Sequence, residues 1–236
     1  MTSVISTTEA ATSIPADYQA DMALAAKYAC AGPRYTSYPT APQFRADYPL
    51  SQYLAWQKRD GDHKRAPLSL YIHLPFCRDI CYYCACNKIV TRRKGVARNY
   101  LDRLEQEIAV QADIVGRRRP VTQMHWGGGT PTYLDDAELT ELMHTLASHF
   151  RLLDKGYREY SIEIDPRTVT IPTIALLKGV GFNRISLGIQ DFDHRVQASV
   201  NRIQPFQQVS ALVDAIRAHE FRSLSFDLIY GLPHQD

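Results

Sequence analysis

The spacing of hydrophobic and polar positions along the chain changes near residue 67. Before that point, helical spacing predicts helices over 17–30 and 51–59, separated by a turn-rich segment over 32–42 in which proline and glycine recur too often for a sheet. Residues 1–16 are rich in Thr, Ser and Ala, which is typical of a disordered lead-in. We therefore expect an N-terminal extension over 17–66 that packs on a larger region over 67–236.

From residue 67 onward, short apolar runs alternate with amphipathic helical patterns. The runs predict five strands, over 69–74, 121–126, 161–164, 184–190 and 224–232. The helical patterns predict helices over 98–115, 135–150, 172–178, 193–200 and 205–219. Repeated strand and crossover helix indicate an α/β fold with a parallel sheet, and five such units favour a (β/α) barrel or partial barrel. Because the chain stops directly after the fifth strand, we expect an incomplete barrel and a longer parent protein.

Composition and charge give no support to several classes of partner. Hydrophobic residues make up 45% of the chain and the formal net charge is +2, so overall charge gives no argument for nucleic-acid binding. No stretch approaches the roughly 18 apolar residues that a membrane-spanning helix needs. The N-terminus also lacks the charged start and apolar run of a secretory signal. We expect a cytoplasmic protein with no nucleic-acid partner and no membrane span.

The cysteines are the strongest chemical signal. Four of the five fall in the short segment from Cys77 to Cys86, in the loop after the first predicted strand, and clustered cysteines in a cytosolic protein indicate a metal site. The spacing of three residues and then two between Cys77, Cys81 and Cys84 allows a compact loop to hold three corners of a four-iron, four-sulfur cluster, with the fourth iron open. A structural zinc site, which usually has four ligands in two separated pairs, is one alternative. An electron-transfer cluster with four cysteine ligands is another.

Further polar and glycine residues lie at the predicted strand ends. Tyr71 and His73 alternate on the first strand and therefore share a face. The glycines over 127–129 follow the second strand, where a backbone without side chains allows close approach to a ligand. Later strands end near Glu163, Gln190 and Asp227. Each of these has an ordinary structural role open to it, such as a core histidine, a turn or a cap, but their shared position at one rim favours a site.

The cysteine loop resembles that of the radical S-adenosylmethionine enzymes. The wider string YIHLPFCRDICYYCACNK (71–88) is similar to the family of oxygen-independent coproporphyrinogen III oxidases, also called coproporphyrinogen dehydrogenases. Other strings resemble the same family in the same order: GPRYTSYPTA (32–41), HWGGGTPTYL (125–134), SIEIDPR (161–167), GFNRISLGIQDF (181–192), VNR (200–202) and FDLIYGLP (226–233). The resemblance covers the chain from about residue 20 to its end.

The resemblance implies roles for individual residues. Cys77, Cys81 and Cys84 match the cluster ligands, whereas Cys86 matches a fourth cysteine that does not bind the cluster. Two molecules of S-adenosylmethionine are implied, and the matching contact positions are Tyr71, Tyr83, Gly128, Gly129, Thr130, Glu163, Gln190, Arg202 and Asp227. Tyr83 stands where the family more often has Phe. Tyr71 and His73 are the candidate catalytic residues. Apart from the resemblance, Arg34 is a candidate partner for a substrate propionate because Arg suits bidentate carboxylate binding, and a structural hydrogen-bonding role is equally open to it.

The activity that the resemblance implies is a radical oxidative decarboxylation. Two propionate side chains of coproporphyrinogen III would become vinyl groups, giving protoporphyrinogen IX in oxygen-independent haem biosynthesis. The enzyme would be a monomer and would need an electron donor and a terminal acceptor that the sequence does not identify. We expect this activity of the longer protein, since the front part alone lacks the end of the barrel. Alternatives on the same scaffold are a haem chaperone, whose relatives generally lack PRYTSYP and the fourth cysteine, and a haem-degrading radical methyltransferase.

Overall fold

The computed structural model describes residues 18–30, 39–57, 66–93 and 95–235. Its contacts divide the chain into two units, Met1–Leu50 and Ser51–Asp236. The predicted lead-in over 1–16, Arg34 and most of the turn-rich segment over 32–42 lie outside the described residues. The packing of an N-terminal extension on the larger region therefore stays a prediction.

The first unit contains α1 (Tyr18–Tyr28) and the short 3-10 helix η1 (Ala41–Gln43). The helix α2 (Leu50–Gln57) begins at the boundary between the units. Its Tyr53 hydroxyl donates to Gln111 Oε1 of the larger unit at 3.2 Å. Sequence periodicity placed this helix in the extension, whereas its contacts group it with the larger unit.

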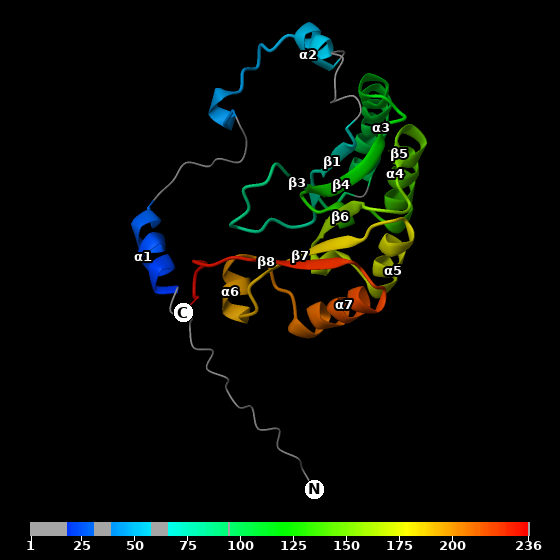
Figure 1. Ribbon diagram of the computed structural model, residues 1–236. Helices are drawn as coiled ribbons and strands as arrows, with labels where there is room; N and C mark the ends of the chain where they lie inside the picture. The colour runs from blue at the N-terminus through cyan, green and yellow to red at the C-terminus, as the bar shows by residue number, and fades with distance from the viewer. Residues whose placement is uncertain (1–17, 31–38, 58–65, 94, 236) are drawn as a thin grey trace. The chain divides into compact units, whose positions relative to one another are not determined.

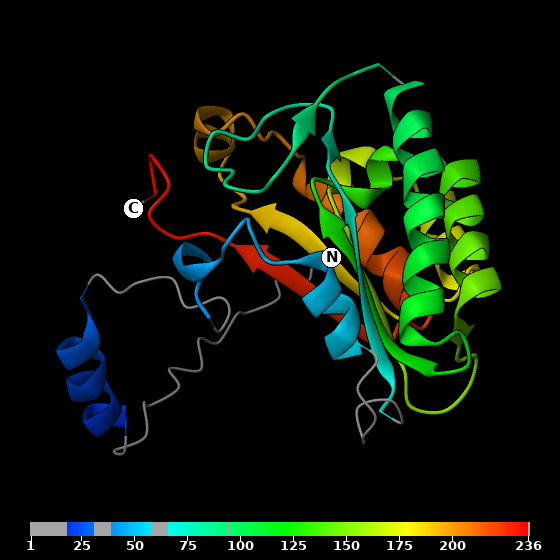
Figure 2. The same cartoon turned by 90° about the horizontal axis from the view of Figure 1, so that it is seen from above.

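A parallel sheet forms the centre of the larger unit (Figures 1 and 2). Its strands follow the order β1 (Leu68–Leu74), β4 (Pro120–Gly128), β6 (Glu159–Ile164), β7 (Arg184–Gln190) and β8 (Ser223–Leu228), and each neighbouring pair is parallel. The short β5 (Arg151–Leu152) adds to β4. The α/β fold class with a parallel sheet is thereby confirmed.

Helices connect the strands, and the longer ones pack against one face of the sheet. They are α3 (Gly95–Val115), α4 (Asp136–His149), α5 (Ile171–Gly179), α6 (His194–Ser199) and α7 (Phe206–Ala218), with the 3-10 turns η3 (Pro131–Tyr133) and η4 (Pro166–Thr168). Figure 2 shows α3 and α4 along one side of the sheet. None of the described helices combines the length and the apolar character needed to cross a bilayer.

Strand alternation separates the core from the opposite face of the sheet. Ile72, Met124, Trp126 and Ile162 are buried in the core that includes residues of these helices. Since successive strand residues point to opposite faces, the intervening positions carry polar side chains on the other face. These are Tyr71, His73, His125, Ser161, Glu163, Ser186 and Asp227. The strand register brings Tyr71 opposite His125, and His125 opposite Ser161.

Two details differ from the sequence expectations. The last strand ends at Leu228 rather than at residue 232, because the Ile229 amide donates to Gln190 O at 3.0 Å and the backbone then turns through Gly231 at a φ of +79°. Two strands of two residues each, β2 (Phe76–Cys77) and β3 (Ile89–Val90), form a separate parallel pair that no periodicity predicted.

Candidate metal and cofactor site

One cavity at the carboxyl ends of the strands collects most of the predicted site residues. Its lining includes Cys77, Cys81, Tyr83, Cys84, Cys86, Gly128, Gly129, Thr130, Glu163, Gln190, Arg202 and Asp227. The same lining contains residues that sequence reasoning missed, namely Asp79, Lys88, Ile164, Asp165, Arg167 and Gly188. Tyr71 and His73 lie outside this lining, on the polar face of β1.

The cysteine loop is closed at its base by strand pairing. Phe76 pairs with Ile89 and Cys77 with Val90, so the residues between them form a loop with fixed ends. The ammonium of Lys88 donates to the carbonyl oxygens of Cys84 and Cys86, at 3.0 and 3.4 Å. These contacts give the cysteines a defined backbone frame.

The loop is also tied to the segment that follows α6. The Tyr82 amide donates to Val200 O at 3.1 Å, and Asn201 Nδ2 donates to Ile80 O at 2.7 Å. Asn201 has a φ of +55°, in the left-handed region that asparagine tolerates better than most residues. The loop position therefore depends on contacts with residues about 120 positions later in the chain.

The thiols lie in a partly buried environment. Cys81 is buried, Cys77 and Cys84 are half-buried, and Cys86 is exposed. Burial raises the pKa of the Cys77 thiol to about 11, and the neighbouring Cys84 and Cys81 add to the effect. Burial likewise raises the pKa of the Tyr83 hydroxyl. At neutral pH Cys77 is therefore protonated, and binding of a metal would release its proton.

The donor set suits an iron–sulfur cluster better than a single ion. Among the residues that the structure describes, no three His, Cys, Asp or Glu side chains are grouped as the ligands of one metal ion. Three soft thiol ligands around one cavity suit separate iron atoms of a cluster. Arg202 Nε is also buried without a partner in the described residues, so the cavity wall holds a spare donor for an anionic group.

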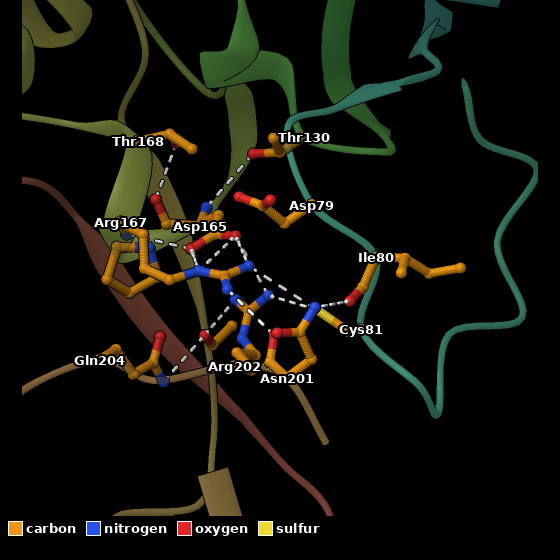
Figure 3. Close-up of polar contacts among 12 residues, drawn as sticks. Asp79, Ile80, Cys81, Thr130, Asp165, Arg167, Thr168, Asn201, Arg202 and Gln204 are labelled. Atoms are coloured by element: carbon orange, nitrogen blue, oxygen red, sulfur yellow. Dashed lines mark hydrogen bonds and ion pairs between the residues drawn. The ribbon is translucent and has the colours of Figure 1, made fainter. Parts of the chain in front are cut away.

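A buried polar network lies against Cys81 (Figure 3). Arg167 Nη2 donates to Asp165 Oδ2 at 2.7 Å and Arg202 Nη1 donates to the same oxygen at 3.1 Å. Both guanidiniums also reach Cys81 Sγ, Arg202 at 3.4 Å and Arg167 at 3.7 Å. Burial alone would raise the pKa of Asp165, but the hydrogen bond from Arg167 and the charge of Arg202 outweigh it and hold the pKa below its usual range. Asp165 is therefore a carboxylate at neutral pH.

A second polar chain crosses the exposed face of the sheet. His73 Nε2 lies 3.0 Å from Asn87 O, which only accepts, so Nε2 carries the hydrogen and Nδ1 accepts from the Tyr71 hydroxyl at 3.1 Å. The Tyr71 ring stacks on that of His125, with centroids 5.8 Å apart. His125 Nε2 contacts Glu163 Oε1 at 3.0 Å. The two candidate catalytic residues are thereby connected to Glu163, one of the predicted contact positions for S-adenosylmethionine.

Sequence reasoning missed His125 as part of this chain. The residue stands within the quoted HWGGG string, and its place on a strand, between the buried Met124 and Trp126, was the signal that could have identified it.

The glycines at the end of β4 are required by backbone conformation and close packing. Gly128 has a φ of +121°, a backbone conformation that side chains rarely adopt. A Cβ on Gly129 would lie 2.6 Å from Phe76 O and 2.8 Å from Pro75 O, both backbone atoms. The Gly129 and Thr130 amides donate to Leu74 O and Phe76 O at 2.9 and 2.8 Å. These residues thus hold the end of β4 against the start of the cysteine loop.

The far wall of the cavity is formed by the ends of β7 and β8. Gln190 lies at a register shift between these strands and has a φ of +70°, which is strained for glutamine. Ser186 Oγ donates to Asp227 Oδ1 at 3.2 Å. The structure therefore places Gln190, Asp227 and Arg202 around one cavity with the cysteines, while their roles toward a cofactor stay predictions.

Comparison with known proteins assigns a family. Residues 71–236 match the family model described as the radical SAM superfamily. The chain is 49% identical over 216 residues to an oxygen-independent coproporphyrinogen III oxidase of Pseudomonas aeruginosa, and 47% identical over 215 residues to the one of Escherichia coli K12. Each alignment covers 91% of this chain and 46% of the relative.

A solved structure gives the same result. The coproporphyrinogen III oxidase of Escherichia coli, described as a radical SAM enzyme, aligns with a TM-score of 0.82 at 46% identity, over 91% of this chain and 46% of that one. The chain thus spans about half the length of the proteins that it matches. The parallel sheet carries the three-cysteine loop at its carboxyl edge, in agreement with these matches. The chain therefore belongs to the radical SAM superfamily.

Proposed function

We propose that this chain supplies the radical SAM portion of an oxygen-independent coproporphyrinogen III oxidase. The observation that carries the proposal is the convergence of Cys77, Cys81 and Cys84 with the segment 128–130 and Glu163 around one cavity. The similarity to relatives of that name supports the substrate. The proposal concerns the whole protein, because the chain spans 46% of those relatives.

The proposed reaction converts two propionates of coproporphyrinogen III to vinyl groups. Each propionate loses one hydrogen atom, one carbon dioxide and one electron, which passes to an acceptor. A bound cluster with an open iron supplies the electron that cleaves S-adenosylmethionine and produces the radical that takes the hydrogen atom. Two molecules of S-adenosylmethionine, one for each propionate, would satisfy this balance.

The chain's own residues would bind and orient the reactants. Cys77, Cys81 and Cys84 would hold the cluster, while the backbone of Gly128 and Gly129 would receive the methionine end of the cofactor. Glu163, oriented by His125 at 3.0 Å, would accept hydrogen bonds from the ribose hydroxyls. The spare Arg202 Nε would pair with a cofactor carboxylate.

The remaining parts of the proposal concern the cellular setting. We infer a cytoplasmic monomer that receives electrons from an external one-electron donor and passes electrons to a terminal acceptor. Tyr71 and His73 would lie next to the reacting groups, since their hydrogen-bonded pair stands on the same sheet face as Glu163.

Anaerobic reconstitution with iron and sulfide tests the proposal. We expect about four iron and four sulfide per chain, as in the cluster itself, and S-adenosylmethionine cleavage to 5′-deoxyadenosine. Cys77→Ala should abolish both, whereas Cys30→Ala, which removes an exposed thiol of the other unit, should leave both unchanged. A colourless wild-type protein, or a cluster with protein ligands at all four irons, would refute the proposal.

Substrate identity needs a separate measurement. The protein extended to the length of its relatives should form vinyl groups from coproporphyrinogen III under anaerobic conditions. Cofactor cleavage without vinyl formation would retain the superfamily and reject this substrate. Tight stoichiometric binding of haem, with no decarboxylation, would instead favour a haem chaperone.

A further inference from the structure

The network around Asp165 contains more positive than negative charge beside one cluster ligand. Two guanidiniums, of Arg167 and Arg202, share one carboxylate, so the group carries a surplus of one positive charge. Both guanidiniums donate to Cys81 Sγ, which is the buried cysteine of the loop. Figure 3 shows the two side chains converging on this sulfur from one side.

Asp165 and Arg202 are shielded from solvent, and Arg167 is largely so. The exposed fractions of the side chains are 22% for Arg167, 8% for Arg202 and 10% for Asp165. Salt screens buried charges much less than exposed ones, so the surplus charge acts on the sulfur with little attenuation. The other charged groups that line the cavity are Asp79, Lys88, Glu163 and Asp227. Within the described residues, the charged groups that donate hydrogen bonds to Cys81 Sγ are the guanidiniums of Arg167 and Arg202.

Backbone contacts hold the arginines independently of the cysteine. Arg202 Nη2 donates to Gly188 O at 2.6 Å, and Arg167 Nη1 donates to Asn201 O at 3.3 Å. Arg167 is also fixed by its own amide, which donates to Asp165 Oδ1 at 3.0 Å. Since both guanidiniums have partners other than sulfur, their positions do not require a bound metal.

We propose that Arg167, held in place by Asp165, acts as a positioning residue that raises the reduction potential of a cluster bound through Cys81. The inference rests on the proposed function, because it requires that Cys81 be a cluster ligand. One-electron reduction, by an external donor that is itself oxidised, makes the cluster and its thiolates more negative by one unit. A neighbouring positive charge and N–H···S hydrogen bonds stabilise that reduced state more than the oxidised one.

The sign of the effect separates this role from a purely structural one. Arg167→Gln removes a positive charge and should lower the potential. Asp165→Asn removes a negative charge from the same network and should raise it. A structural defect would instead shift both variants in the same direction, or reduce cluster content without shifting the potential. Arg167→Lys retains the charge and should show a smaller shift than Arg167→Gln.

A redox titration with dithionite, followed by electron paramagnetic resonance of the reduced cluster, measures the potential without turnover. We expect the ratio of reduced to oxidised cluster in Arg167→Gln to fall at least tenfold at a fixed potential, which for one electron is 59 mV. The matched control is Arg184→Gln. Arg184 is also partly buried and pairs with Glu159 at 2.9 Å, but at the amino-terminal end of β7, so the potential should not change.

Each outcome decides the inference. Opposite shifts in Arg167→Gln and Asp165→Asn, with none in Arg184→Gln, would support it. Loaded variants whose potentials equal the wild-type value would overturn it. If Arg167→Gln takes up no cluster, the potential of Asp165→Asn tests the inference instead. An unshifted or lowered potential in Asp165→Asn would overturn the inference. A wild-type chain that binds no cluster would refute the proposed function itself, whereas loaded variants without a shift refute only the role of Arg167.

Discussion

Removal of the Asp165 carboxylate should destabilise the metal-free chain more than removal of any exposed carboxylate. Asp165 accepts from Arg167 N at 3.0 Å, Arg167 Nη2 at 2.7 Å and Arg202 Nη1 at 3.1 Å. Asp165→Ala leaves two guanidiniums without their shared counterion, and breaking a buried pair in this way costs about 3–5 kcal/mol. We expect the lower end, about 3 kcal/mol, because Arg167 retains 22% exposure and can be hydrated, whereas Arg202 at 8% cannot.

Urea denaturation of the reduced, chelator-treated chain, followed by circular dichroism, measures this loss. With a slope of about 2 kcal/mol per molar urea, a loss of about 3 kcal/mol lowers the midpoint by about 1.5 M. The control is Glu159→Gln, which breaks the more exposed pair with Arg184 and should cost about 0.2–1 kcal/mol. Equal midpoint shifts in Asp165→Ala and Glu159→Gln would contradict the assignment of Asp165 as a buried counterion.

The pH dependence provides a second test of the same carboxylate. The pKa of Asp165 is lower in the folded chain than in the unfolded chain, where Asp titrates at about 3.9. The carboxylate therefore contributes its full stability above that pH. The contribution is lost as the pH falls through the folded-state pKa. The stability difference between wild type and Asp165→Asn should therefore be constant from about pH 7 to pH 5 and shrink at lower pH. A difference that grows on acidification would refute the argument.

Three further predictions follow from the packing and the site. Gly129→Ala should lower the free energy of unfolding by about 1–3 kcal/mol, since the new Cβ meets a backbone oxygen at 2.6 Å. Gly179→Ala, near the end of α5, meets nothing within 4 Å and should raise it by about 0.5–1 kcal/mol. Equal shifts of the thermal midpoint in the two variants would contradict this. Asp135→Ala removes the N-cap of α4 and should cost about 1 kcal/mol by urea denaturation, and no loss would argue against the capping box. In the cluster-loaded chain, Glu163→Gln should weaken S-adenosylmethionine binding about tenfold by calorimetry, and unchanged affinity would reject its role at the ribose.

The fold could be predicted from the sequence because the five long strands carry apolar runs and the longer helices α3, α4 and α7 each carry an apolar stripe. The strand over 224–232 was overextended, since its apolar pattern continues through Ile229 and Leu232 while the backbone leaves the sheet after Leu228. Leu232 is buried, but it packs with Val196 and Val200 instead. The paired segments β2 and β3 have two residues each, which is too short for any periodicity to appear.

The site was predictable where residue type and spacing are diagnostic. Cys77, Cys81 and Cys84 were identified in this way, and the resemblance added further lining residues such as Tyr83, Thr130 and Arg202. Asp165 and Arg167 were missed because an Asp-Pro-Arg string is typical of an ordinary turn, and this one does form the cap of η4. The contact of Arg167 with Cys81 spans 86 residues of sequence, so only the tertiary structure reveals it.

The attachment of the cysteine loop to residues 200–202 has a consequence for how the protein matures. The three thiols are synthesised long before Asn201 and Arg202, whose contacts with Ile80 and Cys81 span 121 residues. A nascent chain that ends before α6 would carry all three thiols without these contacts. Such contacts need both partners to have been synthesised and the entropy of closing the loop between them to be overcome. Iron delivery should therefore be most efficient once residues 200–202 have been made, which places cofactor insertion after the synthesis of β7 and α6.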